Sequence, residues 1–135
     1  MTPVQGYNKA NFVTSSERQL EAQALTHVAL LMNQALIAND RDALVGMVTL
    51  NNRLWLFFYS QIESKQVILP PDVEKNIVNL VAYIMKVAPM AFSGDVNTIR
   101  SLVSINHHIA AGLSEGPADD ARPSESATLS VGLSA

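Results

Sequence analysis

The chain has 135 residues, no cysteine and a single tryptophan, and only 16% of its residues are charged. The absence of cysteine excludes disulfides, thiolate metal sites and a cysteine nucleophile. No apolar run reaches the roughly 18 to 20 residues that a membrane-spanning helix requires. The first residues, Met1 to Gly6, lack the basic start and apolar core of a signal peptide. We therefore expect a cytoplasmic, soluble protein with one domain, and no contact with a membrane.

Charge is concentrated at one end of the chain. Up to Leu113, eight Lys and Arg residues balance eight Asp and Glu residues, so the formal net charge of −3 comes from the residues that follow. A protein that binds phosphate backbones usually carries a basic patch or stripe. The neutral body therefore argues against direct binding to nucleic acid.

The first half of the sequence predicts an arm and two helices. Residues 1–13 are mostly polar and are interpreted as an N-terminal arm. Thr14 and Glu17 have the spacing of a capping box, which predicts a helix from there to about Ala38. After a polar turn, apolar residues at three- and four-residue steps predict a second helix over about 41–63.

Proline and glycine divide the second half. Pro71 is suited to the first turn of a third helix, and Pro89 must end or kink that helix. Gly94 and the Asp that follows it predict a stop and a new cap. The pattern is that of an all-α protein, a small bundle of four main helices over residues 14–113. The acidic, Ser-rich tail, residues 114–135, is expected to be disordered because it has little apolar area to bury.

The sequence contains no pattern typical of catalysis. His107 and His108 are adjacent, so on a helix they diverge by about 100° and cannot chelate one ion together. His27 has no Glu or His one turn away. There is no Gly-rich phosphate loop and no nucleophile elbow. We therefore expect that the protein is not an enzyme and that it binds no metal and no cofactor.

The segment Leu50 to Tyr59 is the most unusual part of the chain. It places Asn52 and Arg53 directly before six consecutive large apolar residues, which would cover every side of a helix. Asn106 similarly interrupts the apolar stripe of the last helix. Asn52 and Arg53 either face solvent while Asn106 hydrogen-bonds in the core, or all three form a polar rim around an apolar groove for a partner helix.

Several motifs in order resemble a known family. They are Gly6-Tyr7, Asn52-Arg53-Leu54-Trp55, Leu69-Pro70, Ile105-Asn106 and Gly112-Leu113. Their order and spacing are similar to the flagellar biosynthesis regulator family FlaF over nearly the whole chain to Leu113.

The chain departs from that family's pattern at two positions and in its tail. Ser104 stands where an acidic residue is expected, and Tyr83 where tryptophan is expected. The tail is longer than expected, so the resemblance implies no role for it.

The resemblance implies a non-enzymatic cytoplasmic protein that binds flagellin as a secretion chaperone and promotes its production and export, opposing the translational repressor FlbT. Terminal segments of flagellin stay unpaired until they pack in the filament, and an apolar groove could hold one of them. The candidate partner-binding residues are Tyr7, Asn52, Arg53, Leu54, Trp55, Phe58, Tyr59 and Asn106. For Trp55 and Phe58, packing in the core is an equally good interpretation.

Two other functions stay open on the sequence alone. One is post-transcriptional regulation of flagellin synthesis, acting with or against FlbT on the flagellin message, which the neutral charge makes less favourable as direct RNA binding. The other is a helical adaptor that dimerises through the surface from Leu54 to Tyr59. A monomer is the favoured state.

Overall fold

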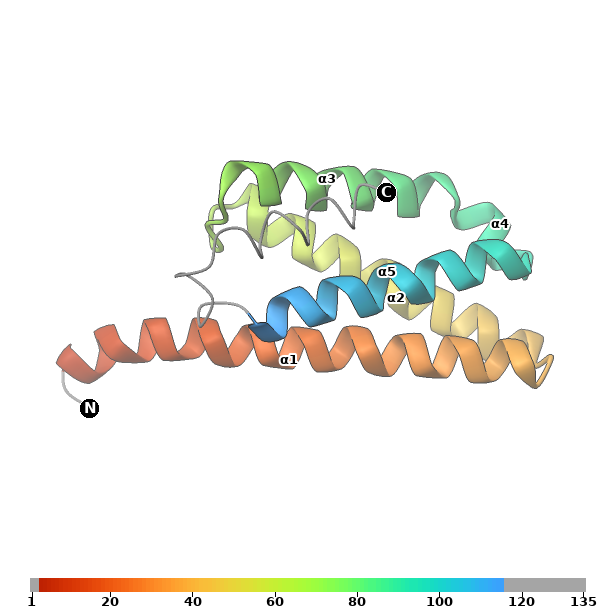
Figure 1. The fold of residues 1–135 in the computed structure, drawn as a ribbon, viewed down its shortest axis with the longest axis horizontal. Helices are drawn as coiled ribbons and strands as arrows, with labels where there is room; N and C mark the ends of the chain where they lie inside the picture. Colours follow the sequence, from red (N-terminus) through yellow and green to blue (C-terminus); the bar gives the residue numbers. More distant parts are fainter. Residues whose placement is uncertain (1–2, 116–135) are drawn as a thin grey trace.

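Five helices make up the part of the chain that the structure describes. A computed structural model describes the backbone of residues 3–115 and the side chains of residues 17–114. The helices are α1 (Pro3–Ile37), α2 (Arg41–Glu63), α3 (Pro71–Lys86), α4 (Ala88–Phe92) and α5 (Val96–Glu115) (Figure 1). The predicted all-α bundle is confirmed, with the short α4 added to the four expected helices.

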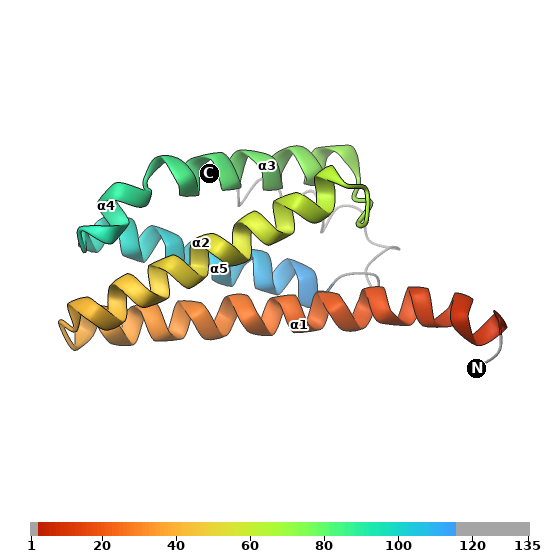
Figure 2. The same ribbon diagram turned by 180° about the vertical axis from the view of Figure 1, so that it is seen from behind.

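The helices form a bundle in which α2 and α5 lie between the two outer helices. Figures 1 and 2 show α1 along one edge of the molecule and α3 along the opposite edge. Helix α1 packs most extensively against α5 and then against α2, whereas α3 packs on α2 and α4. The chain therefore buries its core mainly between α1, α2 and α5.

Short local signals set most of the helix ends. The Asp40 carboxylate accepts a hydrogen bond from the backbone N–H of Ala43 at 3.1 Å and caps α2. Helix α3 ends at Lys86, and Pro89 lies in the first turn of α4, so the expected break near this proline is confirmed. Gly94 follows α4 with φ +85°, a conformation that glycine adopts without strain.

The start of α1 differs from the prediction. The helix begins at Pro3 and runs through Thr14, where the sequence pattern placed a cap. A proline is tolerated in a first helical turn. Extending an existing helix adds a hydrogen bond for each residue, whereas a new end at Thr14 would leave N–H groups without helical partners. The polar residues at this point cost the helix interior less than 1 kcal/mol each.

Some predictions concern residues that the structure does not describe. The side chain of Tyr7 lies outside the described side chains, as do the residues of the tail beyond Glu115. The division of the chain into an arm over 1–13, a bundle over 14–113 and a tail over 114–135 therefore stays a prediction.

The core confirms the helical stripes predicted for α2 and α5. In α2 the buried apolar residues are Leu44, Val48, Trp55, Phe58 and Ile62. In α5 they include Ile99, Leu102 and Ile109.

In α1, apolar residues at three- and four-residue steps predict a core stripe that includes Leu20, Leu25, Val28, Met32 and Ala35. The prediction was wrong at Leu20, because this residue is 61% exposed. The other four are buried as predicted, and Leu25 and Met32 are fully buried.

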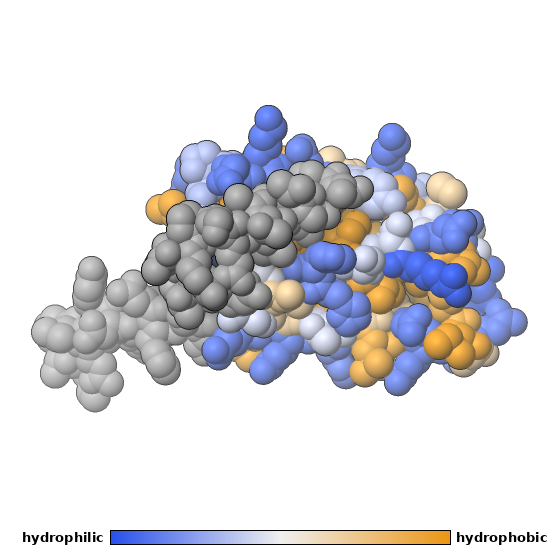
Figure 3. Space-filling view, viewed as in Figure 1, coloured by the Kyte–Doolittle hydropathy of each residue, from blue (hydrophilic) through white to orange (hydrophobic). Residues whose placement is uncertain are grey.

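The surface exposes single large apolar residues on several helices, among them Leu30, Phe57 and Met90. Figure 3 shows apolar side chains scattered among polar ones on one face of the bundle. None of the helices within residues 3–115 is both long enough and apolar enough to cross a lipid bilayer.

Candidate functional site

A buried polar cluster lies between α1, α2 and α5. The side-chain oxygen of Asn106 accepts a hydrogen bond from the indole N–H of Trp55 at 2.9 Å. Its amide nitrogen donates to the carbonyl oxygen of Leu25 at 3.2 Å and to the side-chain oxygen of Asn51 at 2.7 Å. Since Asn106 belongs to α5, Leu25 to α1 and the other two to α2, one side chain ties three helices together.

This cluster determines the roles of two predicted site residues. Trp55 and Asn106 are both 0% exposed, so neither presents a surface to a partner in this fold. The interpretation of Asn106 as a hydrogen-bonded core residue is confirmed. The structure also places Trp55 in the core, where the Phe58 ring packs edge to face against it at a centroid distance of 5.7 Å.

The other predicted site residues on α2 point in different directions. Arg53 is exposed, while Asn52 and Leu54 are half-buried. Tyr59 is also half-buried, and its hydroxyl donates to a carboxylate oxygen of Glu63 at 3.0 Å. The structure therefore does not gather these side chains into one groove along α2. Their contact with a partner stays a prediction.

Asn51 is a buried polar residue that the sequence reasoning missed. It is 0% exposed, and its amide nitrogen forms no hydrogen bond with the described part of the chain. A signal was present, because Asn51 lies three residues after Val48 and four before Trp55, on the buried stripe itself. The buried polar residue of this segment is therefore Asn51, whereas the next two, Asn52 and Arg53, are half-buried and exposed, respectively.

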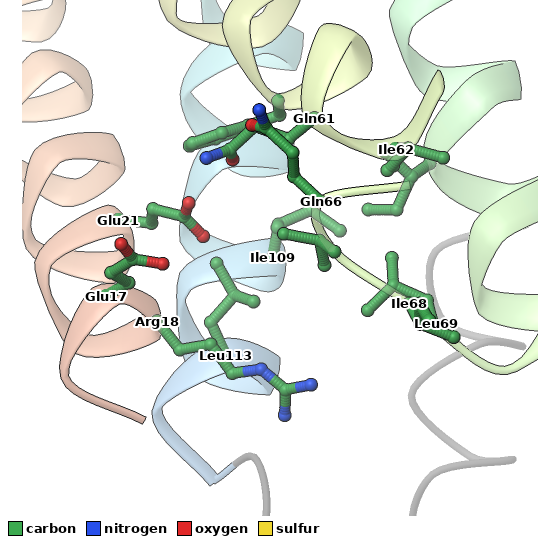
Figure 4. A pocket seen from close by; sticks show the side chains of 13 residues that line it. Glu17, Arg18, Glu21, Gln61, Ile62, Gln66, Ile68, Leu69, Ile109 and Leu113 are labelled. Atoms are coloured by element: carbon green, nitrogen blue, oxygen red, sulfur yellow. The ribbon is translucent and has the colours of Figure 1, made fainter. Parts of the chain in front are cut away.

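A pocket of about 260 Å³ opens where the loop between α2 and α3 meets the middle of α1 and the C-terminal part of α5. Figure 4 shows side chains from these elements converging on it. Its apolar lining consists of Phe58, Ile62, Val67, Ile68, Leu69, Ile77, Ile109 and Leu113. Its polar lining consists of Glu17, Arg18, Glu21, Gln61 and Gln66. Of the predicted site residues, Phe58 contributes to this pocket.

The surroundings of Glu21 at the pocket disfavour its charged form. The pKa of Glu21 is raised from 4.5 to about 6. Burial is the largest cause, the negative charge of Glu17 adds to it, and the positive charge of Arg18 lowers the pKa by a smaller amount. Glu17 and Glu21 lie close together in Figure 4, on the side of the pocket that α1 supplies. A carboxylate with a raised pKa beside a pocket is a common mark of a functional site.

We expect Glu21→Gln to stabilise the protein at pH 7.5. Because the pKa of Glu21 is higher in the folded chain, folding favours the protonated form. The penalty for the charged form is therefore absent below about pH 4.5, grows as the pH rises, and is complete above about pH 6. A shift of this size corresponds to about 2 kcal/mol, and solvent screening of a half-buried group reduces it to about 1 kcal/mol.

Urea unfolding at several pH values measures this effect. The wild-type protein and the variant are expected to converge near pH 4.5 and to separate above about pH 6. Asp42→Asn, at an exposed carboxylate on the first turn of α2, is the control. Equal stability of wild type and Glu21→Gln at pH 7.5 would contradict a cost to the charged form of Glu21.

The chemistry available in this pocket is recognition of an apolar group next to charge. Within the described residues, no three His, Asp or Glu side chains are grouped so that they could hold a metal ion. Among the described residues that line the pocket, the charged side chains are the carboxylates of Glu17 and Glu21 and the guanidinium of Arg18.

The comparisons with known proteins agree with the resemblance seen in the motifs. The family model described as Flagellar protein FlaF matches residues 4–113. No curated protein and no solved structure matches the chain. The matched residues cover α2, α3 and α4 completely and nearly all of α1 and α5. The chain therefore belongs to the FlaF family of flagellar proteins.

Proposed function

We propose that this protein binds flagellin in the cytoplasm as a secretion chaperone and so promotes flagellin production and export. Membership of the FlaF family supplies the flagellar context. Flagellin has terminal segments that stay unpaired until the filament assembles, and such segments need protection of their apolar side chains before export. An apolar pocket with a polar edge suits that task.

The observation that carries this proposal is the pocket between α1, α5 and the loop before α3. Its floor is formed by Ile109 and Phe58 of the core, while Ile68 of the loop is 81% exposed at its edge. A volume of about 260 Å³ is enough for one or two aliphatic side chains, since an engineered cavity of about 150 Å³ already binds benzene. Flagellin would therefore dock through a short apolar anchor rather than along a whole helix.

A small anchor also suits a protein that must release its client. Burial of one or two aliphatic side chains contributes about 1.5 to 3 kcal/mol each. Ordering and association take back part of that free energy. A micromolar affinity corresponds to about −8 kcal/mol, which is more than this anchor supplies, so we expect contacts outside the pocket to contribute the rest.

Isothermal titration of the full chain with monomeric flagellin tests this proposal. We expect saturable one-to-one binding, and Ile68→Ser is expected to weaken it about tenfold, or about 1.4 kcal/mol. The substitution removes an apolar contact from the pocket edge. Because Ile68 is so exposed in the free protein, its loss is expected to change stability by less than about 0.5 kcal/mol.

Ile37→Ser is the matched control for this experiment. Ile37 is 76% exposed, close to the 81% of Ile68, and it lies at the end of α1 away from the pocket. Equal weakening by the two substitutions would contradict the pocket as the binding site. No binding of flagellin at tens of micromolar would contradict the chaperone function and favour regulation through FlbT and the flagellin message.

A further inference from the structure

The two sides of the pocket differ in chemistry. The side formed by α5 and the loop before α3 is mainly apolar and uncharged, with Leu113, Ile109 and Leu69. The side formed by α1 carries two carboxylates, those of Glu17 and Glu21. An occupant that fits both sides therefore has an apolar part and, beside it, a positively charged group that can lie against the carboxylates.

Among the described residues of the pocket lining, Arg18 is the one cation, and it offsets the two carboxylates only weakly. In Figure 4 the guanidinium of Arg18 extends past Leu113, away from the two glutamates. Its effect on Glu21 is also the smallest of the three that act on that carboxyl group, after burial and Glu17. The α1 side of the pocket is therefore net negative.

We propose that the pocket selects a peptide segment in which a large aliphatic side chain is accompanied, about one helical turn away, by a lysine or arginine. This inference rests on the proposed function in one respect, that flagellin would be the protein supplying the segment. The aliphatic side chain lies against Ile109 and Leu113, and the cation lies between the carboxylates of Glu17 and Glu21.

A cation at this position is favourable for two reasons. It compensates the repulsion between Glu17 and Glu21, two like charges on adjacent turns of α1. It also offsets the burial that makes the charged form of Glu21 costly. An acidic residue at the same place would add a third negative charge. Charged residues at the edge of an interface therefore contribute more to the exclusion of wrong partners than to affinity.

Fluorescence anisotropy with short labelled peptides tests the selection on the full chain. The peptides share an Ala- and Gln-based helical sequence with leucines at i and i+4 and differ at one neighbouring position, which is Lys, Gln or Glu. We expect the Lys peptide to bind tightest and the Glu peptide weakest, with about a tenfold difference between them at low salt. Raising the salt concentration is expected to reduce that difference.

Substitutions on the protein identify the carboxylates responsible. Glu21→Gln is expected to reduce the Lys-to-Glu difference to about threefold or less, since one of two carboxylates remains. The control Asp42→Asn removes an exposed carboxylate that does not line the pocket and is expected to leave the tenfold difference unchanged. A peptide with serines in place of both leucines is expected to lose binding.

Several outcomes would overturn the inference, and they differ from failure of the proposed function. Equal binding of the Lys and Glu peptides overturns the charge selection even where flagellin binds. Binding of flagellin but of none of the peptides overturns the short anchor. The tail, residues 114–135, has three large apolar residues of its own, Leu129, Val131 and Leu133. Binding of the Lys peptide only after these three are replaced by serine would assign the pocket to the chain's own tail. Binding of the Lys peptide but not of flagellin would support the inference and contradict the chaperone function.

Discussion

Trp55→Ala is expected to destabilise the whole protein strongly rather than to weaken partner binding alone. The Trp55 side chain is 0% exposed and packs between three helices. Removal of a buried tryptophan side chain costs about 3 to 5 kcal/mol, and domains of this size have only about 5 to 15 kcal/mol in total. Urea unfolding followed by circular dichroism measures the loss as a lower midpoint.

Phe57→Ala is the matched control for that experiment. Phe57 lies two residues further along the same helix and is 53% exposed. Its removal is expected to cost less than about 1 kcal/mol. If Trp55→Ala were as mild as Phe57→Ala, the buried position of the tryptophan would be wrong, and its earlier interpretation as a partner contact would return.

Asn106→Ala is expected to cost about 3 kcal/mol, although it removes little apolar surface. The substitution leaves the indole N–H of Trp55 and the side-chain oxygen of Asn51 without the partner they have now. Each buried polar group left without a partner costs about 1 to 3 kcal/mol. The unfolding midpoint measures this effect, and His107→Ala, at the exposed neighbour, is expected to leave it nearly unchanged.

A double-mutant cycle separates the hydrogen bond from general packing. Trp55→Phe keeps a ring in the core and removes the N–H, and it is combined with Asn106→Ala. Because both changes remove the same 2.9 Å hydrogen bond, their effects are expected to fall short of additivity by about 1 kcal/mol. Strict additivity would show that the bond between the two side chains contributes nothing to stability.

The features that sequence predicted well are those set by a few neighbouring residues. Asp40 caps α2, Pro71 opens α3 and Gly94 stops α4 because each acts on its own backbone or on the next turn. The start of α1 was not predictable in the same way. Thr14 has the chemistry of a cap, but a cap is used only where a helix ends, and here the preceding residues continue the helix.

The rotation of each helix about its own axis decides which of its apolar residues face the core, and sequence did not predict this fully. The six apolar residues after Arg53 left open whether the helix is enclosed or keeps a surface for a partner. In the structure the segment does both. Trp55 and Phe58 face the core, while Leu56 and Phe57 are 45% and 53% exposed. Periodicity gives the spacing of a stripe, but its angular position depends on which helices pack against it.

The pocket could not be found from sequence. Its lining comes from α1, α2, α3, α5 and the loop before α3, so no window of the chain contains a pattern for it. Glu17 looked like part of a capping box, and Glu21 had no distinguishing neighbour. Only the packing of α1 beside α5 brings these carboxylates to an apolar floor, and that packing is a property of the whole bundle.

Phe58 belongs both to the pocket and to the aromatic pair with Trp55, with 5.7 Å between the ring centroids. The chain has one tryptophan, so all of its indole emission arises one ring away from the pocket. A ligand that shifts Phe58 changes the surroundings of that indole. The unlabelled protein thus carries its own optical probe, and stopped-flow emission against a tryptophan-free ligand would give the rates at which the pocket is filled and emptied.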